Sequence, residues 1–501
     1  MNRAIVVGAG PVGLTVALLL ARQGLRVAVV ERQRQIHRGV RTVALDDECL
    51  RIWQSCGVER EIAGHWDGGA AGAVMCRYLT PGGRTFLRLR QCESELGYPQ
   101  AVVVHEGAIV EALCSAAAQT PGIELRFGVE VAGLRQDASG VELELRAADG
   151  AASRERASWV VACDGAGSVV RRLLGVGMRG ETLARPWLIA NIDEEAPVYS
   201  ASIRCDPRRP SVMVSIPHGV RRIECMLRPG EEERIERSAD AVREVLAEVW
   251  PNAIRRPGIE AAVVRFEARV AERWRVGRVF LAGDAAHLTP PFAAQGLAAG
   301  LRDAANIAFK LAGASQGWLD PSVLDTYEDE RRPHQERLIR LALRLGRLMA
   351  PRSNAEALVT QGLVRAATLL PFSDRLLHMR GEAIKPRYRC GFVGGGPLAG
   401  RYLPQPFVEQ GEGRIRRLDE LLGPRMSWIV TGSGASSGAL PPSIDPGDDA
   451  VLVENRDFRD PARTLQAALG RSTAVLVRPD RIIHSHFPSF GESWRPLRSA
   501  S

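Results

Sequence analysis

Lysine is nearly absent from this 501-residue chain, where it occurs only at Lys310 and Lys385. The net charge of +8 is therefore carried almost entirely by arginine, which is spread along the whole sequence. No basic tail and no interleaved aromatic residues accompany it, so the charge does not indicate a nucleic-acid groove. Because the forked donors of arginine suit carboxylates and phosphates, we expect some attraction for anionic ligands.

Long apolar runs and paired cysteines are also missing. The longest apolar run, "VALLLA", is far too short to span a membrane. Nine cysteines occur without a CxxC or any metal-ligand spacing, and the apolar N-terminus is interrupted by "GAGPVG" with no basic region before it, unlike a secretory signal. We therefore expect a cytoplasmic protein with reduced thiols, no membrane contact and no metal.

The first residues present a nucleotide-binding pattern. Residues 3–7 predict a buried strand, "GAGPVG" follows, and "LTVALLLARQG" predicts a helix that stops at Gly24. The three glycines permit a tight turn, approach of a pyrophosphate and close packing of helix on strand. A second strand at 26–31 ends in Glu31, which can accept both ribose hydroxyls and would repel a 2′-phosphate, so the sequence predicts FAD or NAD rather than NADP.

Two later stretches have the same character. "VVACDGAGSVVRRLLG" predicts a strand, a turn at Asp164–Gly165 and a helix. "RVFLAGDAAHLTPPFAAQGLAAG" places an isolated acid, Asp284, after a buried strand and then starts a helix almost without side chains. The lack of bulk there indicates that something large and flat approaches the backbone.

Together, "GAGPVG", "DGAGSVVR" and "GDAAHLTPPFAAQG" resemble the three fingerprints of single-component FAD-dependent aromatic hydroxylases with the p-hydroxybenzoate hydroxylase fold. The resemblance covers roughly residues 3–375. "RTVALDDECLRIWQSCGV" and "VLVRPDR" are most similar to the 3-(3-hydroxyphenyl)propionate hydroxylase and polyketide hydroxylase branch.

This resemblance implies an α/β fold with three units. Residues 1–177 and 276–390 would form a Rossmann-like FAD-binding domain, interrupted at 178–275 by a mixed-sheet substrate domain with one helix around 238–250. Residues 391–501 would form a C-terminal domain of thioredoxin-like topology, without redox function because CxxC is missing.

The resemblance also implies roles for individual residues. Asp284 would hydrogen-bond the ribityl chain, Pro291 would lie beside the isoalloxazine ring, and Arg41 would bridge the pyrophosphate. Asp164 would be the acid that the family associates with both FAD and the nicotinamide. Amides near Gly296 would face the pyrimidine edge of the flavin at a helix N-terminus, whose dipole favours negative charge. The full set of expected FAD-binding residues is Gly8, Gly10, Pro11, Val12, Gly13, Glu31, Arg32, Arg41, Gln100, Val131, Asp164, Gly165, Gly283, Asp284, Pro291, Gln295, Gly296, Leu297 and Ala298.

Two departures from the family pattern stand out. The family usually has Gly-Gln-Gly, a small residue and then Asn, whereas this chain has Ala294-Gln295-Gly296-Leu297-Ala298. Where relatives often carry Gln before a helix, this chain has Glu106, which is unfavourable near FAD unless paired, so Gln100 is the alternative.

The implied chemistry is hydroxylation of a phenolic or other aromatic small molecule. NADH or NADPH would bind transiently and reduce FAD, O₂ would add, and a flavin hydroperoxide would pass oxygen to the ring. Some group should deprotonate or polarise the phenol, and the sequence does not identify it. Met213, His218 and Met226 are the candidates in the expected wall over the flavin, and a homodimer is possible.

Alternative functions remain open. One is a tailoring hydroxylase or epoxidase of an aromatic polyketide or other secondary metabolite, and another is a non-catalytic flavin-binding sensor. Flavin halogenases use a catalytic lysine in the region before the second half of the FAD domain. Halogenation is excluded here because no lysine precedes Lys310.

Several conspicuous residues have simpler interpretations. His287 is expected to pack against a helix, and His105 and His218 are lone histidines. Asp46 and Asp47 are read as helix N-terminal acids. Finally, the arginines at 331 and 332, just before Pro333, are predicted to be a solvated helix start.

Overall fold

The computed structural model describes most of the chain. Within this part, no helix combines the length and apolar character that crossing a bilayer requires. Arg41 lies outside the described residues. The residues described are 3–37, 39, 42–67, 73–92, 94–194, 201–252, 258–370, 384–411, 413–431, 450–454, 457–470 and 473–487.

A six-stranded sheet organises the N-terminal half, and all its neighbouring strands are parallel except the short edge strand β20. Its central strands are continuous β-branched runs and are almost fully buried, as expected for a sheet covered on both faces. The strands predicted at 3–7 and 26–31 are confirmed. In spatial order the strands are β20 (Arg275–Val276), β21 (Val279–Leu281), β12 (Trp159–Ala162), β1 (Arg3–Val7), β2 (Arg26–Glu31) and β8 (Ile123–Phe127).

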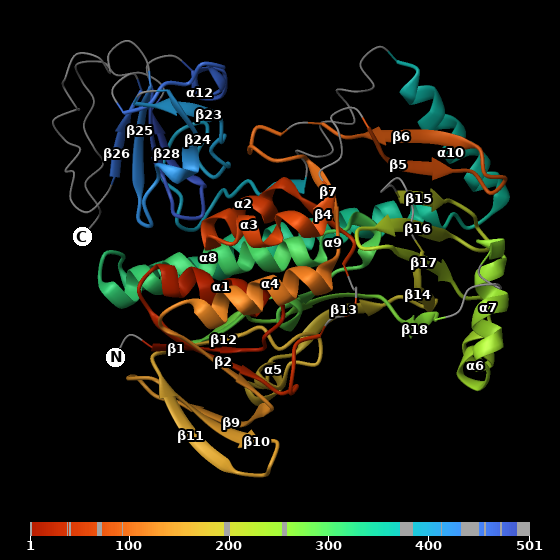
Figure 1. Ribbon diagram of the computed structural model, residues 1–501, viewed down its shortest axis with the longest axis horizontal. Helices are drawn as coiled ribbons and strands as arrows, with labels where there is room; N and C mark the ends of the chain where they lie inside the picture. Colours follow the sequence, from red (N-terminus) through yellow and green to blue (C-terminus); the bar gives the residue numbers. More distant parts are fainter. Residues whose placement is uncertain are drawn as a thin grey trace.

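Helices cover one face of this sheet, and an antiparallel three-stranded sheet lies on the other side (Figure 1). The expected stops are confirmed, since Gly24 and Gly57 both have positive φ just after a helix. The helices are α1 (Pro11–Arg22), α2 (Asp47–Cys56), α3 (Glu59–Ile62), α4 (Glu106–Gln119) and α8 (Gly296–Gln316), while α5 (Val169–Leu173) follows β12. The three-stranded sheet contains β9 (Val129–Gln136), β10 (Val141–Ala147) and β11 (Ala152–Ala157).

A seven-stranded sheet forms the second large layer. It extends beyond the range 178–275, because β5 and β6 come from the segment 74–90 and join by parallel pairing of β5 with β15. The helix predicted around 238–250 is confirmed as α7, and a second helix, α6, precedes it, with Ser238 ending α6 and capping α7. The elements are β18 (Glu260–Val264), β14 (Trp187–Asp193), β17 (Val220–Met226), β16 (Ser211–Ile216), β15 (Ala201–Arg204), β5 (Val74–Leu79) and β6 (Thr85–Arg90), with α6 (Glu231–Arg237) and α7 (Ala239–Ala247).

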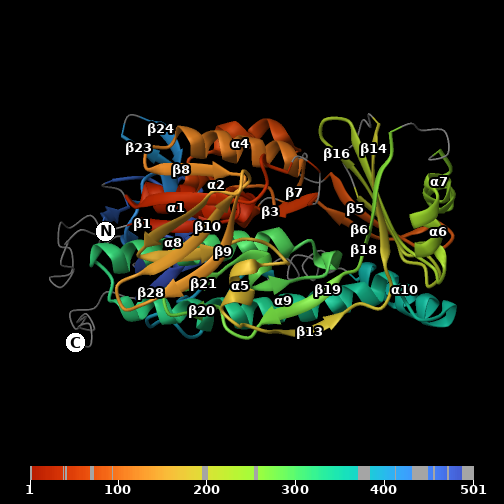
Figure 2. The ribbon, with the colours of Figure 1, turned by 90° about the horizontal axis from the view of Figure 1, so that it is seen from below.

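The two faces of the seven-stranded sheet have different neighbours. On what we call the outer face, Leu188, Ile223 and Cys225 pack with Val245 and Leu246 of α7. Figure 2 shows α6 and α7 on the side of this sheet away from α1 and α8. The opposite face, which we call the inner face, packs against residues that follow the last strand of the six-stranded sheet, including Phe292 and Met349.

Short elements connect the two large sheets. One small sheet pairs β7 with β3 and β4, and another pairs β19 with β13 and β22. Their bounds are β3 (Ala44–Asp46), β4 (Trp66–Asp67), β7 (Ala101–Val104), β13 (Met178–Thr182), β19 (Glu267–Ala271) and β22 (His287–Leu288), with the 3₁₀ turns η1 (Ala63–His65), η3 (Gly283–Ala285), η4 (Pro291–Ala293) and η5 (Pro321–Asp325).

Helix α9 (Thr326–Met349) corrects one prediction. Pro333 is inside this helix rather than near its start, so residues 331 and 332 do not begin it. Arg331 is fully buried rather than solvated. Helix α10 (Asn354–Thr368) follows.

The last part of the chain has its own apolar core, which includes Leu403, Leu418, Ile429 and Val475. Figure 1 shows it beside α2, at the other end of the molecule from the seven-stranded sheet. Its four-stranded sheet has the order β26-β25-β27-β28, with β26 parallel to β25 and the other pairs antiparallel. The elements are β23 (Phe407–Gln410), β24 (Arg414–Arg417), η6 (Leu418–Glu420), β25 (Ser427–Thr431), β26 (Ala450–Val453), α12 (Thr464–Leu469), β27 (Thr473–Val477) and β28 (Ile483–Phe487).

Candidate functional site

The three sequence fingerprints converge at one edge of the parallel sheet. Strands β1, β12 and β21 are neighbours, and their carboxyl ends lead into Gly8, Asp164 and Gly283. In open α/β sheets, ligands bind outside this edge. The fold therefore brings together three segments that are more than a hundred residues apart in the sequence.

Glycines make this convergence possible. A Cβ on Gly8 would lie 2.4 Å from the Cys163 carbonyl oxygen, and one on Gly13 would lie 2.0 Å from the carbonyl oxygen of Gly8. A Cβ on Gly300 would lie 2.6 Å from Val12. Any side chain at these positions would force the fingerprint segments apart.

The starts of α1 and α8 lack side-chain caps. Their N-cap residues, Gly10 and Gln295, make no capping hydrogen bond, whereas Asp46, His105 and Ser168 cap the helices α2, α4 and α5. Space is also open there, since nothing lies within 4 Å of a Cβ placed on Gly10 or Gly296. An uncapped, unobstructed helix start fits an anionic or electron-accepting ligand such as the pyrophosphate or flavin of FAD.

Glu31 lies beside the glycine loop. Its two carboxylate oxygens accept hydrogen bonds from the Ala9 and Gln33 amides at 2.9 and 2.8 Å. Arg32 is exposed next to it, and Val131 is buried on β9. These positions surround the carboxyl end of β2.

Asp164 is fully engaged in local structure. One oxygen accepts from the Ser168 hydroxyl at 2.5 Å, and the other accepts from the amides of Val169 and Val170 at 2.7 and 3.1 Å. Gly165 has φ of 80° in the same turn. In this structure Asp164 therefore acts as a helix-capping turn acid, the ordinary chemistry of an Asp-Gly turn.

Arg171 joins the second fingerprint to the third. It is buried, and its guanidinium donates to the carbonyl oxygens of Ala285 and Ala166 at 2.9 and 2.8 Å. The turn that carries Asp284 is thereby held against the turn that carries Asp164.

The third fingerprint forms an exposed acid followed by a strained loop. Gly283 has φ of 59°, and the Asp284 side chain is exposed after β21. Pro291 begins η4, and Ala294 has φ of 51° and ψ of 35°. That left-handed conformation favours glycine, which explains why a glycine is usual here in the resembling family; this chain keeps the conformation with alanine.

The side chain of Gln295 points away from the open helix start. It donates to Asp46 at 3.3 Å and accepts from Arg302 at 2.9 Å. Arg302 also bonds Asp46 and Glu48, both at 2.5 Å. Burial raises the pKa of Glu48 to about 7, although Arg302 acts in the opposite direction. Asp46 caps α2 as expected for a helix N-terminal acid.

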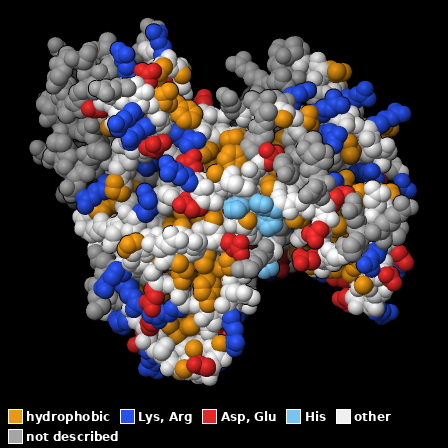
Figure 3. All heavy atoms as spheres, viewed as in Figure 1, with side chains coloured by type: hydrophobic (Ala, Val, Ile, Leu, Met, Phe, Trp, Pro, Cys, Tyr) orange, Lys and Arg blue, Asp and Glu red, His pale blue; other side chains and the backbone are white. Residues whose placement is uncertain are grey.

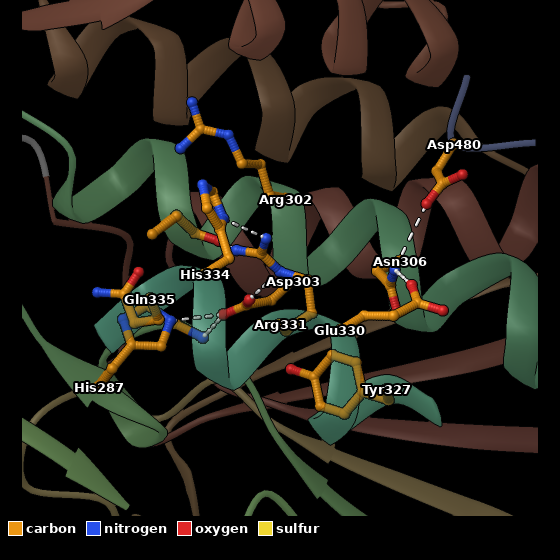
Figure 4. Close-up of polar contacts among 12 residues, drawn as sticks. His287, Arg302, Asp303, Asn306, Tyr327, Glu330, Arg331, His334, Gln335 and Asp480 are labelled. Carbon is orange, nitrogen blue, oxygen red and sulfur yellow. Dashed lines mark hydrogen bonds and ion pairs between the residues drawn. The ribbon is translucent and has the colours of Figure 1, made fainter. Parts of the chain in front are cut away.

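Asp303, which directly follows Arg302 in α8, supports the turn η3 (Gly283–Ala285) from behind. It is fully buried and accepts from the Gly283 amide, His287 Nε2 and Arg331 Nε at 3.0, 2.7 and 2.9 Å. Figure 4 shows its contacts with His287 and Arg331. Burial alone would raise the pKa of Asp303, but His287 and Arg331 outweigh it and lower the pKa. Arg331 is thus an internal partner of the site, which corrects its prediction as a solvated residue, and His287 is a packed residue as predicted.

Glu330, next to Arg331, faces the other way. Its carboxylate contacts Lys310 at 2.9 Å and Arg478 at 2.8 Å, and it accepts from Asn306 at 2.6 Å. Asn306 also contacts Asp480 at 3.4 Å (Figure 4). Arg331 reaches the turn η3 through Asp303, and the adjacent Glu330 reaches Arg478. These two residues of α9 therefore link that turn to the C-terminal part of the chain.

Glu106 is paired rather than free. It begins α4 and accepts a hydrogen bond from the Thr42 amide, so it anchors the segment just after Arg41. Gln100 precedes β7, and its backbone amide donates to the backbone carbonyl oxygen of Cys92 at 3.1 Å. The structure therefore provides the partner that a buried acid requires.

The three substrate-wall candidates do not share one environment. Strand pairing places Met213 opposite Ile223, so it faces α7 on the outer face, which removes it from the expected wall. Met226 is buried on the inner face with Trp187 and Phe266. His218 is exposed in the turn between β16 and β17, with φ of 66°.

His218 and His105 are not lone histidines. His218 Nε2 lies 3.1 Å from His65 Nδ1, and the rings of His218 and His105 are 5.3 Å apart. Figure 3 shows histidine side chains gathered near the middle of one face. Burial and the neighbouring His218 lower the pKa of both His65 and His105. Within the residues described, no group of three or more His, Cys, Asp or Glu side chains could hold a metal ion.

The sequence interpretation missed Asp303 and Arg331. A signal was available, because Arg302, Asp303, Asn306 and Lys310 recur at spacings of three and four in an otherwise apolar helix. Polar residues at that spacing share the face that would normally be core. It also missed the buried charged residues of the inner sheet face, because alternation alone does not say which face of a strand is inside.

Comparisons with known proteins agree with this geometry. Residues 1–342 match the family model described as FAD binding domain. The 3-(3-hydroxy-phenyl)propionate/3-hydroxycinnamic acid hydroxylase of Burkholderia cenocepacia (strain HI2424) is 37% identical over 97% of this chain and 94% of its own length. The protein of the same description from Escherichia coli (strain 55989 / EAEC) is 34% identical over 85% of this chain and 77% of its own.

Solved structures extend the likeness to the whole chain. The flavin-dependent monooxygenase PieE, solved with FAD and substrate, superposes with a TM-score of 0.78 at 23% identity, covering 97% of this chain and 96% of its own. The anhydrotetracycline hydroxylase OxyS from Streptomyces rimosus gives a TM-score of 0.77 at 27% identity, covering 96% and 95%. The chain belongs to the FAD-binding monooxygenase family and is an FAD-dependent aromatic hydroxylase, homologous to the 3-(3-hydroxyphenyl)propionate hydroxylases.

Proposed function

We propose that FAD lies along the carboxyl edge of the parallel sheet, held by the residues predicted from the sequence. Gly10 and the start of α1 would receive the pyrophosphate, Glu31 the ribose, and Asp284 the ribityl chain. The start of α8 would receive the pyrimidine edge of the flavin. The two uncapped helix starts, with open space around Gly10 and Gly296, are the observation that carries this proposal.

Asp284→Ala tests the FAD site. Loss of one charge-assisted hydrogen bond should weaken FAD binding by roughly 10- to 100-fold. The measurement is titration of the apoprotein with FAD, followed by flavin fluorescence. Asp149→Ala, in the exposed turn between β10 and β11, is the control and should bind FAD like the parent chain. Unchanged FAD affinity in Asp284→Ala would remove the assigned role.

We propose further that the enzyme hydroxylates a phenolic small molecule with NADH or NADPH and O₂ as co-substrates. When bound, FAD supplies the transfer of reducing equivalents and of one oxygen atom to the ring. The protein binds and orients the substrate and excludes water. The inner face of the seven-stranded sheet suits the substrate, since Trp187, Phe266 and Phe292 form a mutually packed aromatic group there.

The favoured substrate class is a phenol with a short acid side chain, because the relatives at 37% and 34% identity are described as acting on such compounds. A polyketide is the second candidate, because the hydroxylase OxyS, at 27% identity, is described as acting on anhydrotetracycline. The third alternative, a non-catalytic flavin-binding sensor, does not agree with the membership of the chain in the hydroxylase family.

One screen separates these candidates. The FAD-loaded protein is mixed with NADH or NADPH and either 3-(3-hydroxyphenyl)propionate or anhydrotetracycline, and cofactor oxidation is followed together with the product mass. A substrate-stimulated rate with a gain of one oxygen atom identifies the hydroxylase and its substrate class. Bound FAD with no stimulation by either compound contradicts both proposed substrate classes.

The division into units also remains a proposal. We propose an FAD-binding unit of 1–177 with 276–390, a substrate unit of 178–275 completed by β5 and β6, and a thioredoxin-like unit of 391–501. The mixed four-stranded sheet and the separate core of the last unit support it. A homodimer is also proposed, to be checked by light scattering on the FAD-loaded protein.

A further inference from the structure

A buried ion pair interrupts the inner face of the seven-stranded sheet. Glu224 accepts a hydrogen bond from Arg222 Nε at 2.6 Å, and Arg222 Nη1 lies 3.5 Å from the side-chain oxygen of Asn191. Arg222 and Glu224 are only 5% and 8% exposed. They stand on the central strand β17, which is flanked by β14 and β16.

Strand register shows which way the pair faces. Glu224 is opposite Ile189 and Val212, and Arg222 is opposite Asn191 and Val214. The alternate residue Ile223 is in the outer cluster with α7, so Glu224 faces inward.

The inner face on either side of the pair is apolar. Toward one end lie Trp187 and Met226, which pack with Phe292 of η4. Toward the other end lie Val214 and Ile216, which pack with Val103 of β7. Phe292 follows Pro291, the residue expected beside the flavin ring, so the pair lies in the wall that faces the proposed flavin site.

Burying a carboxylate in such a wall is costly. Removing two charges from water usually costs as much as their mutual attraction returns, and an apolar replacement is often neutral or stabilising. On the outer face of the same strand, Ile223 packs in an apolar cluster with α7, whereas Cys225 also lies beside the buried Arg209–Glu231 ion pair. Because the strand accommodates an apolar residue at the neighbouring position 223, stability alone does not require an ion pair at Glu224, and a role toward a ligand is the alternative.

We propose that Glu224 is the catalytic base that accepts the proton of the phenolic hydroxyl of the substrate. The phenol O–H bond breaks, its proton moves to the Glu224 carboxylate, and the electron pair stays on the phenolic oxygen and enriches the ring for attack on an electrophilic oxygen. The Glu224 side chain is 11% exposed and is therefore largely kept away from water.

Arg222 is the positioning residue of this step. Its guanidinium group donates a hydrogen bond that orients the Glu224 carboxylate, and its contact with Asn191 orients the guanidinium group in turn. Because the substrate hydroxyl would meet the glutamate and not the arginine, Arg222 acts on the reaction only through Glu224.

The proposal rests on the proposed phenol hydroxylase function, and Glu224→Gln tests it. The amide keeps the shape of the side chain but cannot take the proton. With 3-(3-hydroxyphenyl)propionate, kcat should fall about 100-fold or more, in the range of a lost general base. The deficit should shrink as the pH approaches the pKa of a free phenol, about 10, because the substrate then arrives already ionised.

Binding supplies a second readout without turnover. A difference spectrum of the oxidised FAD-loaded enzyme with the same phenol should show a phenolate band at neutral pH, and Glu224→Gln should lack it. The non-phenolic analogue 3-phenylpropionate should bind both proteins equally. Glu236→Gln, exposed on helix α6 on the other side of the sheet, is the matched control and should behave like the parent chain.

Arg222 is tested by a pair of variants. Arg222→Met should lower kcat for the phenol, and Arg222→Lys should recover part of the loss because a cation again faces Glu224. A parent enzyme that hydroxylates the phenol while Glu224→Gln stays within about threefold of it at all pH values overturns the role of Glu224 alone. A parent enzyme that neither binds nor hydroxylates the phenol overturns the proposed function, and the role of Glu224 with it.

Discussion

The two halves of α8 are built in opposite ways. The first turns, Gly296 to Gly300, contain little besides glycine and alanine and have no capping side chain. The following turns carry Arg302, Asp303, Asn306 and Lys310, all buried and all in contact with other helices or loops. The empty half leaves open space at its start, where FAD is proposed to bind, and the charged half fixes where that empty half lies. In this proposal, ionic contacts behind the site set its accuracy.

The largest effect should come from breaking the charged half at Asp303. Asp303→Ala would leave Arg331 and His287 buried without their common acceptor, so the free energy of unfolding should fall by about 3–5 kcal/mol. Urea denaturation of the FAD-loaded protein measures this. Asp320→Ala, at an exposed turn start, removes an acid outside the network and should cost much less unfolding free energy. Equal losses of unfolding free energy in the two variants would mean that the network around Asp303 contributes no more to stability than one exposed turn does.

Glu330 of α9, which pairs with Lys310 in the charged half of α8, should make the free energy of unfolding depend on pH. Burial would raise the pKa of Glu330, but Arg478 and Lys310 outweigh it and lower the pKa to about 2. Because the unfolded chain binds this proton first, as the pH falls below about 4.5, the native contribution, on the order of 3 kcal/mol, is lost between that pH and about 2.

Glu330→Gln sharpens this test. The variant should be less stable than the parent near neutral pH, and its unfolding free energy should fall less steeply in acid. The measurement is urea unfolding at several pH values down to about 3. Parallel pH profiles for the two proteins would contradict the lowered pKa of Glu330.

The smallest effects should come from the empty half, and they should differ between two glycines on the same helix. A Cβ at Gly300 would meet Val12 at 2.6 Å, so Gly300→Ala should destabilise the apoprotein by about 1–3 kcal/mol. A Cβ at Gly296 meets nothing within 4 Å, so Gly296→Ala should stabilise the apoprotein by up to about 1 kcal/mol.

FAD should reverse the apparent benefit at Gly296. If the flavin edge approaches this helix start, the added methyl group obstructs it and FAD affinity falls although the apoprotein is more stable. Thermal unfolding of the apoprotein and fluorescence titration with FAD together measure both changes. A Gly296→Ala protein with unaltered FAD affinity would place the flavin elsewhere.

The sequence predicted the empty half better than the charged half. Glycine spacing, strand ends and the helix start at Gly296 are local features, because each depends on backbone conformation within a few residues. The ionic contacts are not local: Arg331 looked like a surface residue because Pro333 suggested a helix start, yet the helix runs through that proline. Only the fold shows that Asp303 faces Arg331.

The substrate wall shows a second kind of limit. Alternation in β16 and β17 was visible in the sequence, but which alternate residues face the flavin depends on the side covered by α7. Met213 was therefore placed on the wrong face and Glu224 was overlooked. The two strands from 74–90 could not be assigned to this sheet either. They join it through β5, whose partner β15 lies about 120 residues later in the sequence, as the pairing of Cys76 with Ala201 shows.

That long-range pairing also governs how the chain can fold during synthesis. The β5–β6 hairpin waits for β15 before it joins a sheet, and β1 waits for β12 and β12 for β21 before the parallel sheet is complete. The seven-stranded sheet lacks its edge strand β18 until residue 264 has been synthesised, and the parallel sheet lacks β21 until residue 281. The strand order alone therefore leaves apolar strands without partners in any chain truncated before these points, however stable the finished protein is.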